Sequence, residues 1–455
     1  MSELLRDFAA VVARHPDRTA LVEGSGRSVS FAWLGARSAA LASAWQRRGI
    51  GRGDRVLLAM RLDADLYAAL AALWSLGATV VLPEPAMGLK GLRHAARVTR
   101  PRALCTSGAY GILRWVIPAL WPLAHLRPAA AQAAARPPDG PAARPTGRLP
   151  DGADIALVSF TSGTGGAPKA IPRSHDFLAA QHRAIAPLLE SPQAERDLVA
   201  FPVFALINIA AGRTSVLPNW RMSRPGDLAP ARLAAWIEAQ RVTRALLPPA
   251  LCETLVAASP PAGLTHLLTG GGPVFPDLLD RLARLRPDLR VTCVYGSTEA
   301  EPIAHLEAGA ILPDDRAAMD GGQGLLVGRP VPEIGLRIVG DEIQVCGSHV
   351  NAGYLDPAHD RDNKIREGET VWHRTGDAGR IDADGRLWLL GRIGSGVPVA
   401  GRDLLPFAVE VAARQWPGVR QCALMAAGGS ACLVIEGAAG HRADWQARAA
   451  RLGIN

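Results

Sequence analysis

The chain has 455 residues, of which 48% are hydrophobic, so it is long enough to form two or three domains with a buried core. Its formal net charge of +8 comes from 47 arginines and three lysines that are scattered among alanines and prolines, a pattern that argues against nucleic-acid binding. Six widely spaced cysteines, without a C-x-x-C pair or a histidine at metal-ligand spacing, exclude a zinc site and are expected to be reduced and buried.

The first two thirds of the chain alternate short apolar runs with amphipathic stretches. Residues 1–8 have the pattern of an amphipathic helix and lack the cationic region followed by an apolar region that is typical of a secretory signal. We therefore expect a cytoplasmic protein. Helices are predicted at residues 64–76 and 228–240. Strands are predicted at residues 55–60, 78–82, 103–105, 155–160, 245–247, 266–268 and 291–294. Strands that alternate with helices predict an α/β fold with mostly parallel sheets covered by helices.

Residues 110–126 are apolar enough to raise the question of a membrane helix. Arg114, Pro118, Pro122 and His125 interrupt this stretch well short of the roughly 20 residues that a spanning helix needs. We therefore predict no membrane span.

Composition divides the rest of the chain into further segments. Residues 127–151 consist mainly of Ala, Pro, Arg and Gly, which predicts a loop without a core of its own. After Gly322, alternating strands at residues 335–339, 342–345 and 386–390 predict a small β subdomain. Residues 394–455 carry one helix at 407–415 and a strand pair around Cys422 and Cys432. We thus predict a large multi-subdomain N-terminal domain at 1–393 and a short, truncated α+β C-terminal domain at 394–455.

The loop at residues 161–169 has the composition of a phosphate-binding loop. Glycines let several backbone N–H groups turn toward one anion, hydroxyls add donors and a lysine supplies positive charge. An ordinary P-loop is excluded because Pro168 precedes Lys169 and Ala170 follows it. The alternative is a flexible surface turn. The candidate phosphate-binding residues are Thr161, Ser162, Gly163, Thr164, Gly165, Gly166 and Lys169.

Three further motifs carry groups that suit a nucleotide, although each is weak by itself. Residues 295–299 offer an aromatic face, hydroxyls and a carboxylate directly after an apolar strand. Residues 372–377 place Asp377 in an expected glycine turn that could hold ribose hydroxyls, and residues 384–392 end on Arg392.

In this order and spacing, the motifs resemble the adenylate-forming superfamily of acyl-CoA synthetases, fatty acyl-AMP ligases, peptide-synthetase adenylation domains and firefly-type luciferases. The resemblance runs from the N-terminus to about Glu410. It implies that the loop at 161–169 embraces the β- and γ-phosphates of ATP and that Lys169, Thr298 and Glu299 are catalytic. It also implies that Glu299 binds Mg²⁺, that Asp377 holds the ribose and that Arg392 reaches the ribose or a phosphate. The remaining implied nucleotide-binding residues are Gly270, Gly271, Gly272, Tyr295, Gly296 and Ser297.

Within the superfamily, residues 201–206, 214–218, 363–365 and 372–377 resemble the olefin β-lactone synthetase group and its acyl-CoA-ligase-like relatives. This resemblance implies ATP-dependent, AMP-forming activation of a carboxylic acid, followed by transfer to a thiol of coenzyme A or an acyl carrier protein, or by closure to a β-lactone. An apolar pocket for a fatty or other hydrophobic acyl chain is suggested by Phe201, Phe204, Leu206 and Ile207, of which at least half are expected to be ordinary core.

The chain also departs from the pattern of the family. Gly165 stands where Thr or Ser is usual, Gly394 and Pro398 alter the expected hinge, and no lysine follows Lys364, although family members carry a catalytic lysine near the C-terminus. A truncated sequence, complementation by another chain, or a degenerate homologue would each explain this. The alternative function is therefore a catalytically impaired ATP- or acyl-adenylate-binding protein that acts with another biosynthetic protein. A redox enzyme with a dinucleotide fold is excluded because no G-x-G-x-x-G occurs in a βαβ context.

Overall fold

A computed structural model describes residues 2–84, 87–128, 150–161, 168–399, 402–427 and 430–454. The chain forms two compact units, of which the first comprises Met1–Leu247 with Asn351–Arg361 and the second comprises Pro248–Val350 with Asp362–Asn455. Most of the loop predicted at 127–151 lies outside the described residues. These two units do not correspond to the predicted domains at 1–393 and 394–455, and the boundary at residue 393 stays a prediction.

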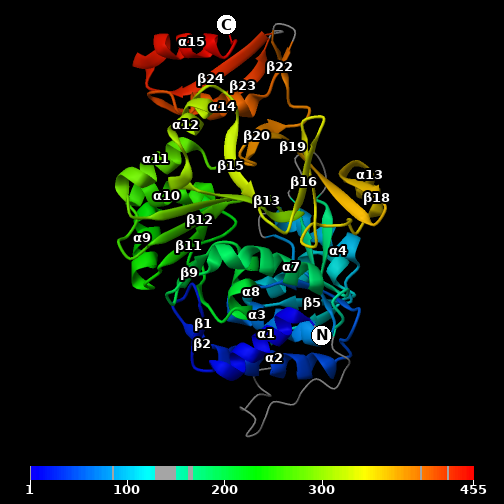
Figure 1. Cartoon of the computed structure of the whole chain (residues 1–455). Coiled ribbons are helices and arrows are strands. Elements are labelled where there is room, and N and C mark those ends of the chain that lie inside the picture. The colour runs from blue at the N-terminus through cyan, green and yellow to red at the C-terminus, as the bar shows by residue number, and fades with distance from the viewer. Residues whose placement is uncertain are drawn as a thin grey trace. The chain divides into compact units, whose positions relative to one another are not determined.

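The first unit contains two largely parallel sheets (Figure 1). One has the order β6-β5-β3-β4-β7-β8 and is parallel except for β8; the other has the order β11-β9-β10-β1-β2 and is parallel except for β2. The buried runs Val56 to Leu58 and Ala156 to Val158 show the continuous hydrophobicity of strands covered on both faces. The strands are β1 (Thr19–Val22), β2 (Ser28–Ser30), β3 (Arg55–Ala59), β4 (Thr79–Val81), β5 (Ala103–Thr106), β6 (Ala124–Leu126), β7 (Ile155–Phe160), β8 (Ala170–Ser174), β9 (Arg196–Val199), β10 (Thr214–Val216) and β11 (Arg244–Leu247).

Helices of the first unit begin where the sequence supplies caps. The hydroxyls of Ser30 and Ser174 and the carboxylate of Asp63 accept N–H bonds from the first turns of α2, α7 and α3, respectively. Because α3 packs on β4, α8 packs on β9 and β10, and α1 packs on both helices, a helical layer separates the two sheets. The helices are α1 (Glu3–Arg14), α2 (Phe31–Gln46), α3 (Ala64–Ser75), α4 (Gly88–Thr99), α5 (Leu113–Val116), α7 (His175–Ile185), α8 (Pro202–Ala210) and α9 (Pro230–Ala239).

The buried His175 should make folding sensitive to mild acid. It opens α7, is 1% exposed and packs edge-on against Trp74. Burial lowers its pKa to about 4, more than Asp154 and Asp176 raise it. Between pH 6.5 and 4 the unfolded chain therefore binds more protons, and the free energy of unfolding should fall as pH drops, by about 3 kcal/mol in all.

Urea unfolding at pH 7.5 and pH 4.5 checks this prediction. The substitution His175→Phe should flatten the pH dependence, whereas His15→Gln, at an exposed position, should keep the wild-type slope. Equal slopes for wild type and His175→Phe would show that His175 is not the group responsible.

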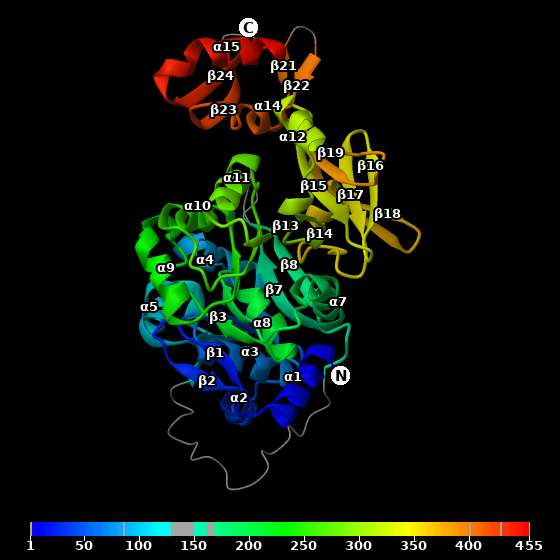
Figure 2. The same ribbon diagram turned by 60° about the vertical axis from the view of Figure 1, so that its left-hand side comes forward.

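The second unit is built mainly from antiparallel strands (Figure 2). Within it, β12 pairs parallel with β13, and the antiparallel order then runs β13-β14-β15-β20-β19-β17-β16, with β18 also on β19. The strands are β12 (His266–Gly270), β13 (Arg290–Ser297), β14 (Ala300–Glu307), β15 (Leu325–Pro330), β16 (Gly335–Val339), β17 (Glu342–Cys346), β18 (Lys364–Glu367), β19 (Thr370–Ile381) and β20 (Leu387–Arg392). The predicted mixture of parallel sheets and a small β subdomain is thus confirmed.

Residues after 394 form a small α+β element of the second unit. The strand pairs β21 (Val397–Val399) with β22 (Arg402–Leu404) and β23 (Val419–Ala427) with β24 (Ser430–Gly437) are antiparallel. Trp416 and Trp445 form a small core on which Cys422 and Ile435 pack. Figure 2 shows α15 beside β24. The helices of the unit are α10 (Pro249–Ala258), α11 (Pro276–Leu285), α12 (Pro313–Asp320), α14 (Pro406–Ala413) and α15 (Arg442–Arg451), and α13 (Asp360–Asn363) spans the join between the units.

The cysteines match expectation only in part. No cysteine of the described ranges is in a disulfide, and Cys105, Cys252 and Cys293 are buried. The expectation that every cysteine is buried was wrong, because Cys432 is exposed on β24, where alternate side chains point away from the core. Among the described residues, no helix is both long enough and apolar enough to cross a membrane.

Candidate active site

The two ends of the candidate phosphate loop, Thr161 and Lys169, adjoin a pair of strands in the first unit. Strands β7 and β8 pair antiparallel up to Phe160 and Ala170, and the backbone N–H of Thr161 donates to the carbonyl of Lys169 at 3.1 Å. Both ends of the loop are therefore fixed to each other. A strand follows the loop where a P-loop would have a helix, in agreement with the exclusion of an ordinary P-loop. The predicted residues Ser162, Gly163, Thr164, Gly165 and Gly166 lie outside the described residues.

Side chains distant in sequence hold the lysine end of this loop. His94 Nε2 is 2.8 Å from the carbonyl oxygen of Pro168, and because a carbonyl only accepts, Nε2 carries the proton. The Lys169 Nζ atom lies 5.3 Å from the centre of the Tyr354 ring, within cation–π range. The backbone N–H of Tyr354 donates to Asp360 Oδ1 at 2.8 Å. Neither His94 nor Tyr354 was predicted as a site residue, because these contacts join residues far apart in the chain.

The contact between Tyr354 and Lys169 should matter for ATP use. We expect Tyr354→Leu to raise the KM for ATP about two- to tenfold, because a cation–π contact is worth roughly 0.5 to 1.4 kcal/mol. The substitution Tyr354→Phe keeps the aromatic face and should remain near wild type. Steady-state kinetics at saturating acid measures both, and an equal KM for the Leu and Phe variants would contradict the prediction.

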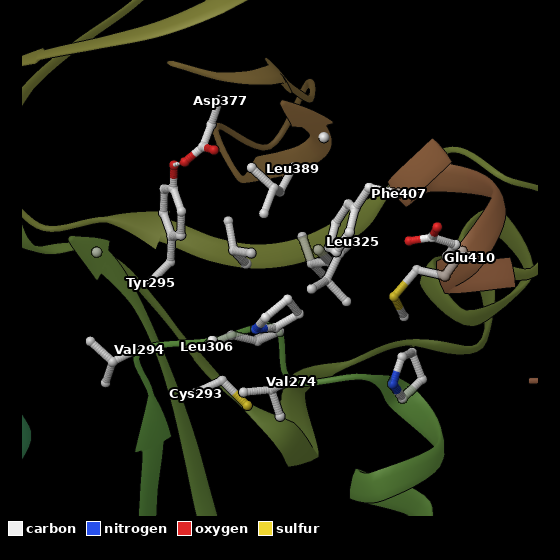
Figure 3. Close-up of a pocket in the computed structure, with 18 of the residues that line it drawn as sticks. Val274, Cys293, Val294, Tyr295, Leu306, Leu325, Asp377, Leu389, Phe407 and Glu410 are labelled. Atoms are coloured by element: carbon white, nitrogen blue, oxygen red, sulfur yellow. Dashed lines mark hydrogen bonds between the residues drawn. The ribbon is translucent and has the colours of Figure 1, made fainter. Parts of the chain in front are cut away.

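In the second unit, Asp377 joins two predicted nucleotide-binding residues. The Tyr295 hydroxyl donates to Asp377 Oδ2 at 2.7 Å (Figure 3). Arg392 Nη1 donates to Asp377 Oδ1 at 2.6 Å. The expectation that Asp377 sits in a glycine turn was wrong. Asp377 lies inside β19, directly opposite Arg392 on β20. Gly376 takes a φ of 72°, but the strand continues through it, so no turn forms.

Burial sets the protonation of this group. Burial and the charge of Asp377 raise the pKa of Tyr295 well above its ordinary value, so the phenol stays a neutral hydrogen-bond donor. Burial lowers the pKa of Arg392, but its bond to Asp377 and the nearby charges, which include Asp377 and Glu299, together outweigh burial and raise the pKa overall. Asp377 thus accepts one neutral and one charged hydrogen bond.

A pocket of about 440 Å³ opens beside these residues in the second unit. Figure 3 shows Val274, Cys293, Leu306, Leu325, Leu389 and Phe407 around it, which gives a mostly apolar interior below the polar pair of Tyr295 and Asp377. Gly271, Gly272 and Gly296 contribute backbone to the wall. A flat aromatic base suits such walls, and its sugar suits the polar end.

Two predicted glycines have a steric reason to be glycine. A Cβ on Gly270 would lie 2.4 Å from the carbonyl oxygen of Val294, and one on Gly296 would lie 2.9 Å from that of Ala300. Both contacts are too close for a side chain. The glycines therefore allow β12 and the β13–β14 hairpin to carry backbone close to the pocket.

Thr298 and Glu299 form the connection between β13 and β14. Strand β13 continues through Tyr295 to Ser297, so the motif begins within the strand rather than after it. The Ser297 hydroxyl accepts the N–H of Glu299 at 3.3 Å, and the charge of Glu299 contributes to the raised pKa of Arg392. The described residues contain no cluster of three or more possible metal ligands. One carboxylate ligand fits Mg²⁺, because this ion keeps several waters and would be coordinated by substrate phosphates as well.

The pocket also contains residues that sequence analysis missed. Phe407 and Glu410 come from α14, and Met319 comes from α12. Phe407 packs 6.0 Å from Phe275, centre to centre. The sequences of α12 and α14 do not indicate which of their side chains reach a pocket.

Of the four residues predicted to line an acyl pocket, Phe201 precedes α8 and the other three lie on it. Phe204 and Ile207 are buried, whereas Phe201 and Leu206 are half-buried. The ring centres of Phe201 and Phe204 are 5.9 Å apart. Two of the four are therefore core, as expected, and the acyl pocket stays a prediction.

The fold and the grouping of Tyr295, Asp377 and Arg392 at the pocket are those expected of an ATP-dependent, adenylate-forming ligase. Residues 8–355 match the model of the AMP-binding enzyme family, and the chain belongs to that family. It is 31% identical to an olefin beta-lactone synthetase of Stenotrophomonas maltophilia (strain K279a), over 95% of this chain and 86% of that protein. It is 28% identical to a feruloyl-CoA synthase of Amycolatopsis sp, over 90% of this chain and 82% of the other.

Solved structures show the same fold. The O-succinylbenzoate coenzyme A synthetase of Bacillus subtilis, in complex with ATP and magnesium ion, superposes with a TM-score of 0.78 at 21% identity. The superposition covers 98% of this chain and 94% of that one. The fold expected from the resemblance is thus confirmed.

Proposed function

We propose that this enzyme activates a hydrophobic β-hydroxy carboxylic acid as its acyl-adenylate and then closes it to a β-lactone. The observation that carries the proposal is the Asp377 group at the pocket, in a chain whose 31% identical relative is an olefin beta-lactone synthetase. Transfer of the acyl group to the thiol of coenzyme A or a carrier protein is the second route, favoured by the similarity to feruloyl-CoA synthase. The proposed location is the cytoplasm, which supplies ATP and Mg²⁺.

The predicted site residues would each act on one part of ATP during adenylate formation. The acid carboxylate attacks the α-phosphorus of ATP, a new O–P bond forms, and pyrophosphate leaves with the electrons of the broken bond. Asp377 would accept ribose hydroxyls, while Arg392 and Lys169 would meet negative charge on phosphate oxygens. The Thr298 hydroxyl would donate a hydrogen bond to the α-phosphate. Glu299 would hold Mg²⁺, which neutralises phosphate charge when bound.

The lactone step needs no further cofactor. In the adenylate of a β-hydroxy acid, the hydroxyl oxygen bonds to the acyl carbon, the acyl–phosphate bond breaks and AMP leaves. The hydroxyl proton passes to a base or to water. Ring closure is intramolecular, so the enzyme contributes chiefly by holding the hydroxyl near the acyl carbon and by excluding water.

Acid-dependent ATP–pyrophosphate exchange tests the first step across a panel of fatty, β-hydroxy and aromatic acids. We expect exchange with hydrophobic acids, and β-hydroxy acids should also yield AMP and a lactone without added thiol. Measurable ATP binding without exchange for any acid would overturn the enzyme assignment. Exchange that leads to product only when coenzyme A or a carrier protein is added would replace the lactone route by thiol transfer.

A further inference from the structure

Residues 87–127 of the first unit combine positive charge with exposed aromatic side chains. This stretch contains seven lysines and arginines and no aspartate or glutamate. It comprises α4, the 3₁₀ turn Gly108–Ile112, α5, the 3₁₀ turn Pro118–Leu120 and two strands. Helix α4 and α5 both contact the turn Pro118–Leu120, so these elements lie side by side.

Helix α4 separates its apolar and cationic residues onto opposite faces. Leu92, Ala95 and Ala96 are buried in a core cluster, together with Ile117 and Leu120. The outward face carries exposed cations at helical spacing, namely Lys90, Arg93, Arg97 and the capping residue Arg100. The helix therefore presents a stripe of positive charge to solvent.

The neighbouring turns expose apolar side chains that the core does not use. Trp115 is 73% exposed, Ile112 63% and Trp121 57%, although Leu113 and Ile117 of the same segment pack into the core. Large exposed apolar residues that gather in one segment mark an interaction surface more often than chance. We define the aromatic–cationic face as the four cations of α4 together with Leu89, Tyr110, Ile112, Trp115, Val116 and Trp121.

Neighbouring elements reinforce the positive charge. Arg48 donates to the carbonyl of His125 at 2.7 Å, and burial together with Arg127, Arg114 and Arg48 lowers the pKa of His125. Arg102, one of the seven cations of the stretch, is paired with Asp54.

We propose that the aromatic–cationic face binds the surface of a membrane that contains anionic lipids. Tryptophan and tyrosine favour the lipid–water interface because their rings are apolar with one polar edge. Lysines and arginines beside them are attracted to anionic headgroups. A nucleic acid would engage the cations but would leave Ile112, Val116 and Leu89 in water, so the mixed face fits a lipid surface better. This binding needs no spanning helix.

Co-sedimentation of the full chain with vesicles tests the proposal. Vesicles of phosphatidylcholine with 30% phosphatidylglycerol should bind the protein at low salt, and pure phosphatidylcholine should bind it at least tenfold more weakly. Lys90→Glu with Arg93→Glu should weaken binding at least tenfold, and so should Trp115→Ser with Trp121→Ser. Matched controls are Arg221→Glu with Arg224→Glu, and Leu312→Ser with Val339→Ser, which change exposed residues elsewhere and should bind like wild type.

Several outcomes would overturn the proposal. These are absence of binding to anionic vesicles at low salt, equal binding to neutral vesicles, or equal losses in the face variants and their controls. A wild-type protein that ignores vesicles but forms dimers, which Trp115→Ser with Trp121→Ser dissociates in size-exclusion chromatography, would assign the face to self-association instead. The vesicle assay needs neither ATP nor acid, so its result is independent of the proposed enzyme function.

Discussion

Replacing Glu299 by glutamine should reduce acid-dependent ATP–pyrophosphate exchange by on the order of 10³-fold or more, because the variant loses the proposed Mg²⁺ ligand. Glutamine keeps the size of the side chain and removes its charge. The carboxylate sits in the short connection between β13 and β14, where the Ser297 hydroxyl holds its backbone N–H, and its charge acts on Arg392 at the pocket. Without this carboxylate, Mg²⁺ would be coordinated only by waters and phosphates.

The exchange assay should be run over a range of Mg²⁺ concentrations. If Glu299 is a ligand, the half-saturating Mg²⁺ concentration of the variant should rise together with the loss of rate. Glu307→Gln is the matched control, because Glu307 ends strand β14, which begins directly after Glu299, but pairs with Arg290 and Thr292. Wild-type exchange in Glu299→Gln would show that the metal ligand has been misassigned.

The sequence predicted those parts of the fold that depend on local pattern. Strands β3, β4, β5, β7 and β12 and helix α3 lie within one or two residues of their predicted bounds, because continuous apolar runs and a capped amphipathic stretch are local signals. The position of Asp377 was not predictable in this way. The Thr-Gly-Asp sequence is typical of a turn, but pairing of β19 with β20 keeps Asp377 extended and opposite Arg392.

The site residues that belong to sequence motifs were predicted, whereas those that tertiary packing brings to the site were not. Tyr295, Asp377 and Arg392 were identified separately, and the fold brings them together over 82 and 15 residues of sequence. Phe407 reaches the pocket from a helix whose sequence only indicates burial, and His94 reaches Pro168 across 74 residues. Such contacts depend on how elements pack, and a single sequence does not record that packing.

The second large effect is expected at Asp377, whose geometry limits what it can bind. A carboxylate offers about four lone-pair sites, and the hydroxyl of Tyr295 and the guanidinium of Arg392 take one on each oxygen. Two sites remain, which matches the two hydroxyls of a ribose. Each bond to a charged acceptor is worth about 1.5 to 3 kcal/mol, so losing both should raise the KM for ATP about 10²- to 10⁴-fold.

The substitution Asp377→Asn should produce this loss, because the amide has one accepting oxygen and turns an NH₂ group toward the donors Tyr295 or Arg392. The sharper measurement compares ATP with 2′,3′-dideoxy-ATP. In the wild type, the KM for the dideoxy nucleotide should exceed the KM for ATP by a factor similar to the rise in KM for ATP that Asp377→Asn causes. The variant should hardly distinguish the two nucleotides, because the ribose hydroxyls and the carboxylate are the two partners of the same hydrogen bonds. Tyr295→Phe removes one internal donor, leaves both ribose sites in place and should keep the discrimination. If Asp377→Asn still preferred ATP as strongly as wild type does, the ribose would have to be held by another residue, and Asp377 would serve only to position Tyr295 and Arg392.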